Sequence, residues 1–271
     1  SSASGELGQI KFDDSYYYLK EQSVWMLLGF FGLFFFTLFS HKKLYSLAVP
    51  LLVASIILLL LVFIPGLGIK ALGAHRWINF HFFVIQPAEF VKLSLAIYLA
   101  AWFSKNKSGA RGTPRGLIVF LIMSILVGGL LILQPATSTV VVLLGAGLAI
   151  YFLSGAPPRH VLGVIVLGVV ALGLVIYGTP YRRERVLSFL NPNQDTQVSN
   201  YHLNEALTAI GSGGLLGVGY GESKSKVSAL PEAIGDSIFA VAAEEFGFVG
   251  AGIIIALFAA LTFRLFWLAK K

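Results

Sequence analysis

The run HVLGVIVLGVVALGLVIYG, residues 160–178, decides the fold class of this chain. It contains no Asp, Glu, Lys or Arg and is long enough to cross the hydrocarbon core of a bilayer as a helix. We expect helices because each span must satisfy its own backbone in lipid, and no alternating ten-residue barrel pattern occurs. The sequence therefore predicts an all-α, polytopic membrane helix bundle. Seven spans can be drawn: 23–40, 47–64, 87–104, 117–133, 139–154, 160–178 and 238–265.

The composition supports a membrane protein over a soluble one. Hydrophobic residues make up 56% of the 271 residues and charged residues only 12%, which ordinary soluble packing does not explain. In a soluble protein, a net charge of +7 would suggest binding to nucleic acid. In this chain the positive residues lie mainly in the loops between membrane spans, so we expect no nucleic-acid partner. The absence of cysteine excludes disulfides and thiolate metal sites. The opening residues resemble neither a Met start nor a signal peptide, so we expect the chain to begin inside a longer protein.

The loops divide into two alternating sets by charge. One set holds lysines and arginines without a single acid, and such loops are expected in the cytoplasm. The Lys and Arg counts of the two sets, ten and nine, differ little, so the orientation depends on the length of one outer loop that can cross regardless of its charge. This orientation places the loop at about 179–237, the 65–86 loop and the QPATST hairpin on the outer face. We predict one membrane-embedded domain over residues 1–271.

The stretch from Tyr181 to Gly247 is the only long polar segment. It carries eight of the thirteen acids and an arginine cluster, so we expect the chemistry there. Its glycines at 211, 213, 214, 217, 219 and 221 fit neither a dinucleotide fingerprint nor a P-loop. Turn formation and close helix packing are the better interpretation of these glycines.

Glu89 and Lys92 lie three residues apart on one helical face, near the outer end of the 87–104 span. An isolated charge in the membrane costs roughly 2.5–3.5 kcal/mol, so the two should pair or face a water-filled cavity. They are either a structural ion pair or the wall of a cavity that binds an anionic substrate. Both interpretations remain open.

Arg76 and Trp77 precede that span in the outer loop. Tryptophan belongs at a headgroup interface, and the arginine could contact lipid phosphate there. The sharper hypothesis is that the Arg76 fork holds a pyrophosphate. His75 and His81 are too weakly patterned to predict a metal site.

Asp236 stands where the polar loop meets the last span. It could cap that helix, or it could act as a general base at the outer mouth of the bundle, with Glu232 supplying a second acid close by. Glu244 and Glu245 lie deeper on the same helix. We expect these two to face the bundle and to bond to neighbouring polar groups.

Six segments in register resemble the SEDS family (shape, elongation, division and sporulation), the FtsW and RodA type of peptidoglycan polymerases. AAWFSKNK and the PEAIGDS segment favour the FtsW side, whereas YHLNE leans toward RodA. The matching segments are GAHRWINF, QPAEFVKLSLAIYLA, LILQPATST, YRRERVLSFLNP, YHLNEALTAIGSGGLLGVGYG and LPEAIGDSIFAVAAEEFGFVGA.

The resemblance implies a fold of ten helices, of which about seven fall in this chain. It implies a multi-pass protein of the bacterial cytoplasmic membrane that joins lipid II units on the outer face beside a monofunctional penicillin-binding protein. By the same resemblance, Asp236 falls on the essential aspartate and Glu89 on a motif glutamate. Positions implicated in substrate handling fall on Arg76, Lys92 and Glu232.

The sequence departs from the family pattern at two positions. Glu205 stands where the family usually has glutamine, so a hydrogen-bond donor could be exchanged for an acceptor in substrate binding. The hairpin reads QPATST in place of QPDLGT, and Ala136 cannot do what that aspartate does. The second departure bears on the hairpin acid and leaves the role of Asp236 intact.

These residues suggest one mechanism and two rivals. Asp236 would deprotonate the acceptor sugar's 4-hydroxyl, which attacks the donor's anomeric carbon while Arg76, Lys92 or a divalent cation stabilises the departing pyrophosphate. A divalent cation is the one cofactor that this mechanism admits. One rival is a flippase for lipid-linked precursors, which would continue its polar residues into the cytoplasmic half. The other is a non-catalytic scaffold for a penicillin-binding protein.

Overall fold

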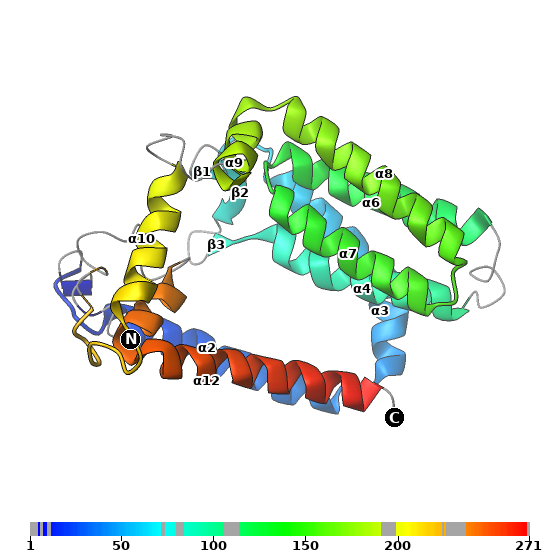
Figure 1. Ribbon diagram of the computed structural model, residues 1–271. Helices are drawn as coiled ribbons and strands as arrows, with labels where there is room; N and C mark the ends of the chain where they lie inside the picture. The colour runs from blue at the N-terminus through cyan, green and yellow to red at the C-terminus, as the bar shows by residue number, and fades with distance from the viewer. Residues whose placement is uncertain are drawn as a thin grey trace. The chain divides into compact units, whose positions relative to one another are not determined.

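The computed structural model describes residues 5, 8–9, 12–71, 74–79, 84–105, 114–190, 199–223, 225 and 237–269. Each of the seven predicted spans overlaps a helix, and the predicted all-α class is confirmed (Figure 1). These helices are α2 (Tyr17–Leu38), α3 (His41–Leu61), α4 (Pro87–Lys105), α6 (Pro114–Leu133), α7 (Thr137–Leu153), α8 (Pro158–Tyr177) and α12 (Ile238–Ala269).

By length and composition, five of these helices could cross a membrane: α2, α3, α6, α8 and α12. The other two are α7, which has 17 residues, and α4, whose first turns carry Glu89 and Lys92. None of the residues of α2 and α8 is buried. Such uniformly apolar, uncovered helices are typical of membrane spans, because lipid can cover them as well as protein does.

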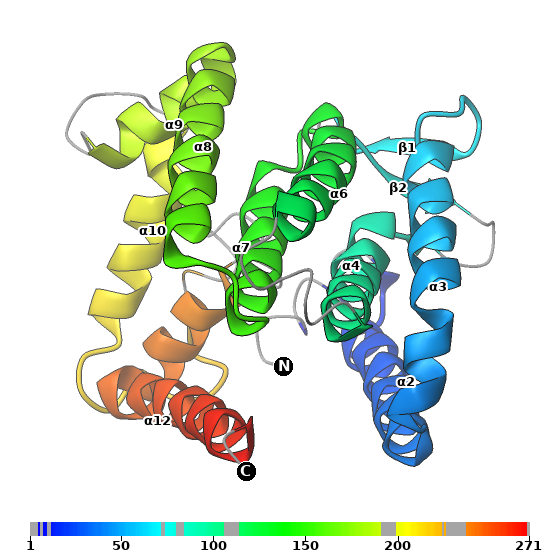
Figure 2. The same cartoon turned by 90° about the vertical axis from the view of Figure 1, so that its right-hand side faces the viewer.

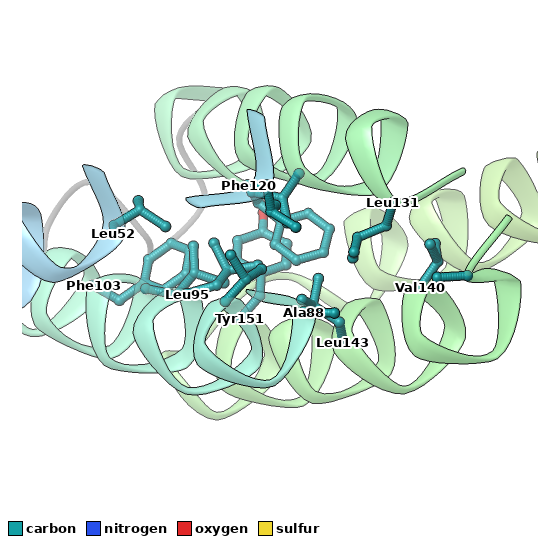
Figure 3. Packing of buried hydrophobic residues seen from close by; sticks show 14 of the residues in the cluster. Leu52, Ala88, Leu95, Phe103, Phe120, Leu131, Val140, Leu143 and Tyr151 are labelled. Carbon is teal, nitrogen blue, oxygen red and sulfur yellow. The ribbon is translucent and has the colours of Figure 1, made fainter. Parts of the chain in front are cut away.

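The chain divides into two compact units, Phe34–Leu174 and Ser1–Leu33 with Val175–Lys271. The single domain predicted over residues 1–271 stays a prediction. In the first unit, α4 packs against α3, α6 and α7 around one apolar core. Tyr151 lies at its centre, fully buried and stacked on Phe120 with 5.4 Å between the ring centroids (Figure 3).

A small antiparallel sheet stands beside the ends of these helices (Figure 2). Its strands are β1 (Gly68–Ala71), β2 (Ala74–Asn79) and β3 (Val84–Ile85), in the order β1-β2-β3. Ile78 of β2 is fully buried, and β3 ends two residues before α4 begins at Pro87. The sequence predicted only a loop at 65–86, because strands this short carry too few residues to show an alternating pattern.

In the second unit, the predicted outer loop at 179–237 contains two helices, α9 (Pro180–Leu190) and α10 (Ser199–Ser212). Pro180 begins α9, where a proline's missing N–H costs nothing. α10 packs against α12 through Ala209, Ala240 and Val241, which are all buried. The small side chains let the two helices approach closely.

The predicted continuous span at 238–265 is wrong in one respect, since α12 is interrupted at Gly247, where φ is 66° and ψ is −168°. The interruption opens backbone groups on both sides of this glycine. A loop from residues 214–219 bonds them: the N–H groups of Val218 and Gly219 donate to the carbonyls of Glu244 and Glu245 at 3.0 and 3.1 Å. In return, Phe248 N–H donates to the Gly214 carbonyl at 2.9 Å and Val249 N–H to the Leu215 carbonyl at 3.2 Å.

Candidate functional site

Arg76 lies on β2 and reaches the turn between α6 and α7. Its Nε donates to the carbonyl of Gln134 at 3.1 Å, and its Nη2 donates to the carbonyl of Pro135. These carbonyls follow the C-terminus of α6, where the helix dipole favours a cation. Two of the five N–H donors of the guanidinium are used in this way. Backbone groups therefore fix the orientation of the side chain, and within the described residues the other N–H donors of the guanidinium are left for an anion.

Glu89 and Lys92 form the ion pair that their spacing predicts, with 2.8 Å between Lys92 Nζ and Glu89 Oε2. The side chains are 58% and 34% exposed, respectively, so an isolated pair of this kind contributes roughly 0.2–1 kcal/mol. Val91 and Leu95, on the other face of α4, are buried in the core and hold the helix in place. The pair is thus a weak structural contact that presents an ammonium group and a carboxylate at the start of α4.

Gln134 is a buried residue whose role the sequence did not reveal. It is 1% exposed, and its Nε2 donates to the Leu59 carbonyl in the last turn of α3 at 3.0 Å. The sequence indicated only a turn at Gln134-Pro135. The available signal was a large amide at the end of an apolar run, because a buried amide needs a partner.

Ala136 follows in the same hairpin and occupies the N-cap position of α7. It is buried and forms no side-chain cap hydrogen bond. A methyl group cannot accept from the first N–H groups of a helix, as an aspartate at this position would. The consequence of Ala136 for the role of the hairpin acid stays a prediction.

The remaining predicted residues belong to the other unit of the chain. Glu205 lies on α10 and is partly exposed. Glu232 and Asp236 lie outside the described residues, and α12 begins two residues after Asp236. The roles of all three stay predictions.

Glu244 confirms the expectation for the deeper acids. It is 4% exposed and accepts a hydrogen bond from Ser223 Oγ at 2.6 Å. Glu245 is 3% exposed beside it. Among the described residues, no three His, Cys, Asp or Glu side chains gather as a metal site, and the divalent cation stays an untested prediction.

Membrane-length apolar helices, together with charged side chains at a helix start and in one long polar stretch, define a multi-pass helical membrane protein. The chain belongs to the cell cycle protein family that comprises FtsW, RodA and SpoVE, whose sequence profile matches residues 1–271.

Curated relatives support this membership. A probable peptidoglycan glycosyltransferase FtsW of Geobacter metallireducens is 34% identical over 263 residues, which cover 97% of this chain and 70% of the relative. The stage V sporulation protein E of Bacillus subtilis is also 34% identical and is covered to 72%. The name of the Geobacter relative agrees with the FtsW side of the family that the sequence favoured.

Solved structures share the fold. One, from work on the structural coordination of polymerization and crosslinking by a peptidoglycan synthase complex, aligns with a TM-score of 0.71 and 31% identity over 93% of this chain and 70% of its own. The rod shape determining protein RodA of Thermus thermophilus aligns with a TM-score of 0.65 and 29% identity over 99% of this chain and 71% of its own. The predicted family membership and the predicted helical membrane fold are confirmed.

Proposed function

We propose that the chain is a peptidoglycan glycosyltransferase that joins lipid II units into glycan strands on the outer face of the bacterial cytoplasmic membrane. The observation that carries the proposal is the family match over residues 1–271, within a family whose curated members include named peptidoglycan glycosyltransferases. The anchored guanidinium of Arg76 and the accessible ammonium of Lys92 support it, because a lipid diphosphate needs cationic partners.

In the proposed reaction, Asp236 takes the proton from the 4-hydroxyl of the acceptor sugar. The resulting oxygen forms a bond to the anomeric carbon of the donor as the bond to the pyrophosphate oxygen breaks. A single displacement inverts that carbon, and the pyrophosphate leaves as an anion, so no separate acid is required. Arg76 and Lys92 stabilise the leaving group, and Glu89, Glu205 and Glu232 bind the substrate. A divalent cation beside the pyrophosphate would supply further charge stabilisation.

The apolar helices support a lipid-linked substrate, and a solved relative supports a crosslinking partner. The uncovered apolar faces of α2 and α8 give the lipid chains of the substrate a bilayer-facing surface. A polymerase of glycan strands works beside an enzyme that crosslinks them, and a solved relative comes from a complex that couples the two steps. We propose a monofunctional penicillin-binding protein as this partner.

The proposal is tested with purified protein in vesicles that carry labelled lipid II on the accessible leaflet, with and without the transpeptidase partner. Asp236→Asn should abolish strand formation, because the base is lost while the side chain keeps its size. Asp13→Asn is the matched control, since Asp13 is exposed and contacts only local side chains in the described residues.

Polymer from the Asp236→Asn variant would reject the assignment of the base. Translocation of labelled lipid II without any glycosidic bond would favour the flippase. Neither polymer nor translocation of lipid II, with or without the transpeptidase partner, would favour the scaffold.

A further inference from the structure

Three segments that are distant in the sequence meet at the α6–α7 hairpin. Arg76 on β2 donates to the carbonyls of Gln134 and Pro135, and the Gln134 side chain donates to the carbonyl of Leu59 on α3. β1 follows α3 after six residues and pairs with β2. The end of α3 is therefore linked to Arg76 in two ways. One link runs along the chain into β1 and across the sheet to β2, and the other runs through the hydrogen bonds of the α6–α7 hairpin.

Gln134 connects Arg76 to α3 through hydrogen bonds. Its backbone carbonyl accepts from Arg76 Nε at 3.1 Å, while its side chain donates to Leu59 at 3.0 Å. The residue is 1% exposed, so water cannot replace either contact cheaply. Without the side-chain bond, the hairpin carbonyls that orient Arg76 lose their direct tie to α3.

We infer that Gln134 is a positioning residue that fixes the Arg76 guanidinium for a diphosphate group of the lipid-linked substrate. The inference rests on the proposed function only for the identity of that substrate. It assigns Gln134 no contact with the diphosphate. The residue holds the carbonyls of Gln134 and Pro135 in place, and these accept from one side of the guanidinium. The other N–H donors of Arg76 are then oriented before the diphosphate binds, so binding costs less side-chain entropy.

The test measures the binding of farnesyl diphosphate, a short lipid diphosphate, to the purified full chain by equilibrium titration. Gln134→Met keeps the side-chain length and removes the amide. Loss of one neutral hydrogen bond that orients Arg76 should weaken binding roughly three- to tenfold. In an Arg76→Gln background, the same substitution should have almost no further effect, because the group that it positions is gone.

Two further variants separate positioning from stability. Ser55→Ala removes another buried bond of α3, from Ser55 Oγ to the Leu51 carbonyl at 2.8 Å, with no link to Arg76, and it should leave diphosphate affinity unchanged. If Gln134→Met does not fold, Gln134→Leu replaces it, since a leucine side chain is also apolar and also lacks the donor.

Three outcomes would overturn the inference: binding that does not depend on Arg76, an equal loss from Gln134→Met in both backgrounds, or a loss of the same size from Ser55→Ala. Binding needs no polymerisation, so the result is independent of the Asp236 experiment. If the unmodified protein makes no polymer but the effects of Gln134→Met and Arg76→Gln on diphosphate affinity are non-additive, the proposed function is rejected and the positioning role is retained.

Discussion

The interruption of α12 at Gly247 depends on glycines in the loop that bonds to it. A Cβ on Gly217 would lie 2.1 Å from the Glu245 carbonyl oxygen, and one on Gly213 would lie 2.3 Å from the Ala243 carbonyl oxygen. Gly217 also has a φ of 84°, where side chains are disfavoured. We therefore predict that Gly217→Ala severely destabilises this part of the protein.

The magnitude follows from two terms. The left-handed conformation costs alanine about 1–2 kcal/mol. Relief of the clash requires the loop to move away from α12, which breaks the bonds from Val218 N–H to Glu244 and from Gly219 N–H to Glu245. The two carbonyls belong to Glu244 and Glu245, which are 4% and 3% exposed, and each of these buried acceptors left without its partner costs about 1–3 kcal/mol. The total, roughly 3–8 kcal/mol, is comparable with the whole stability of many proteins, about 5–15 kcal/mol.

Neighbouring glycines provide matched controls that separate the two terms. Gly214 has a φ of 54° and open space around its Cβ position, so alanine there should cost only the conformational term. Gly213 meets the backbone of α12 without a positive φ, so alanine there should cost only the term from the clash. Gly211 lies in α10 in open space, and alanine there should be neutral or stabilise by up to about 1 kcal/mol.

The assay is thermal unfolding of the four variants in one detergent, followed by fluorescence and by size-exclusion recovery after heating. The expected order of stability is Gly211→Ala, then Gly214→Ala, then Gly213→Ala, with Gly217→Ala the lowest. A Gly217→Ala protein as stable as Gly214→Ala would refute the reasoning, because it would mean that the loop does not approach α12 as closely as the structure shows.

Two further substitutions test buried contacts. Ser223→Ala removes the buried hydrogen bond to Glu244 and should lower the free energy of unfolding by about 1–3 kcal/mol, measured by denaturation in mixed micelles; no change would mean that the bond is not formed. Tyr151→Phe loses the contact between Tyr151 Oη and His160 Nδ1, at 3.2 Å, and keeps the ring, so it should cost about 0.5–1.5 kcal/mol. Tyr151→Ala should cost about 3–5 kcal/mol, and equal losses from both would contradict the stacked core.

Most of the fold could be predicted because lipid imposes one strong rule. Each span had to be a helix with its own backbone bonds, so the apolar runs alone located these helices. The starts of α4, α6, α7 and α8 lie within three residues of prediction, whereas α2 and α3 begin six residues earlier than predicted. The 65–86 and 179–237 segments were predicted as loops because the strands and helices in them are stabilised by contacts with other segments of the chain. β2 is held by β1 and by the hairpin carbonyls, and α10 is held by α12, contacts that no local pattern records.

The candidate site was predictable to different degrees. The Glu89–Lys92 pair followed from helical spacing, and the structure confirms it. Arg76 was identified by its residue type, but the carbonyls that orient it lie about sixty positions away and could not be foreseen. Asp236 and Glu232 were assigned from their place at a helix start and from a family resemblance, and these assignments stay predictions.

The features that the sequence missed share one physical cause. A bilayer leaves no water to bond an opened backbone, so every irregularity in a span needs a partner from elsewhere in the protein. Gln134 supplies such a partner to α3, and the glycine loop supplies it to α12. A glycine that follows two acids inside an apolar run, as Gly247 follows Glu244 and Glu245, is therefore a signal for an interrupted helix. Acidic side chains buried in lipid are costly unless a second segment supplies polar partners for them. The same segment can also form hydrogen bonds with the backbone groups exposed by the interruption of the helix.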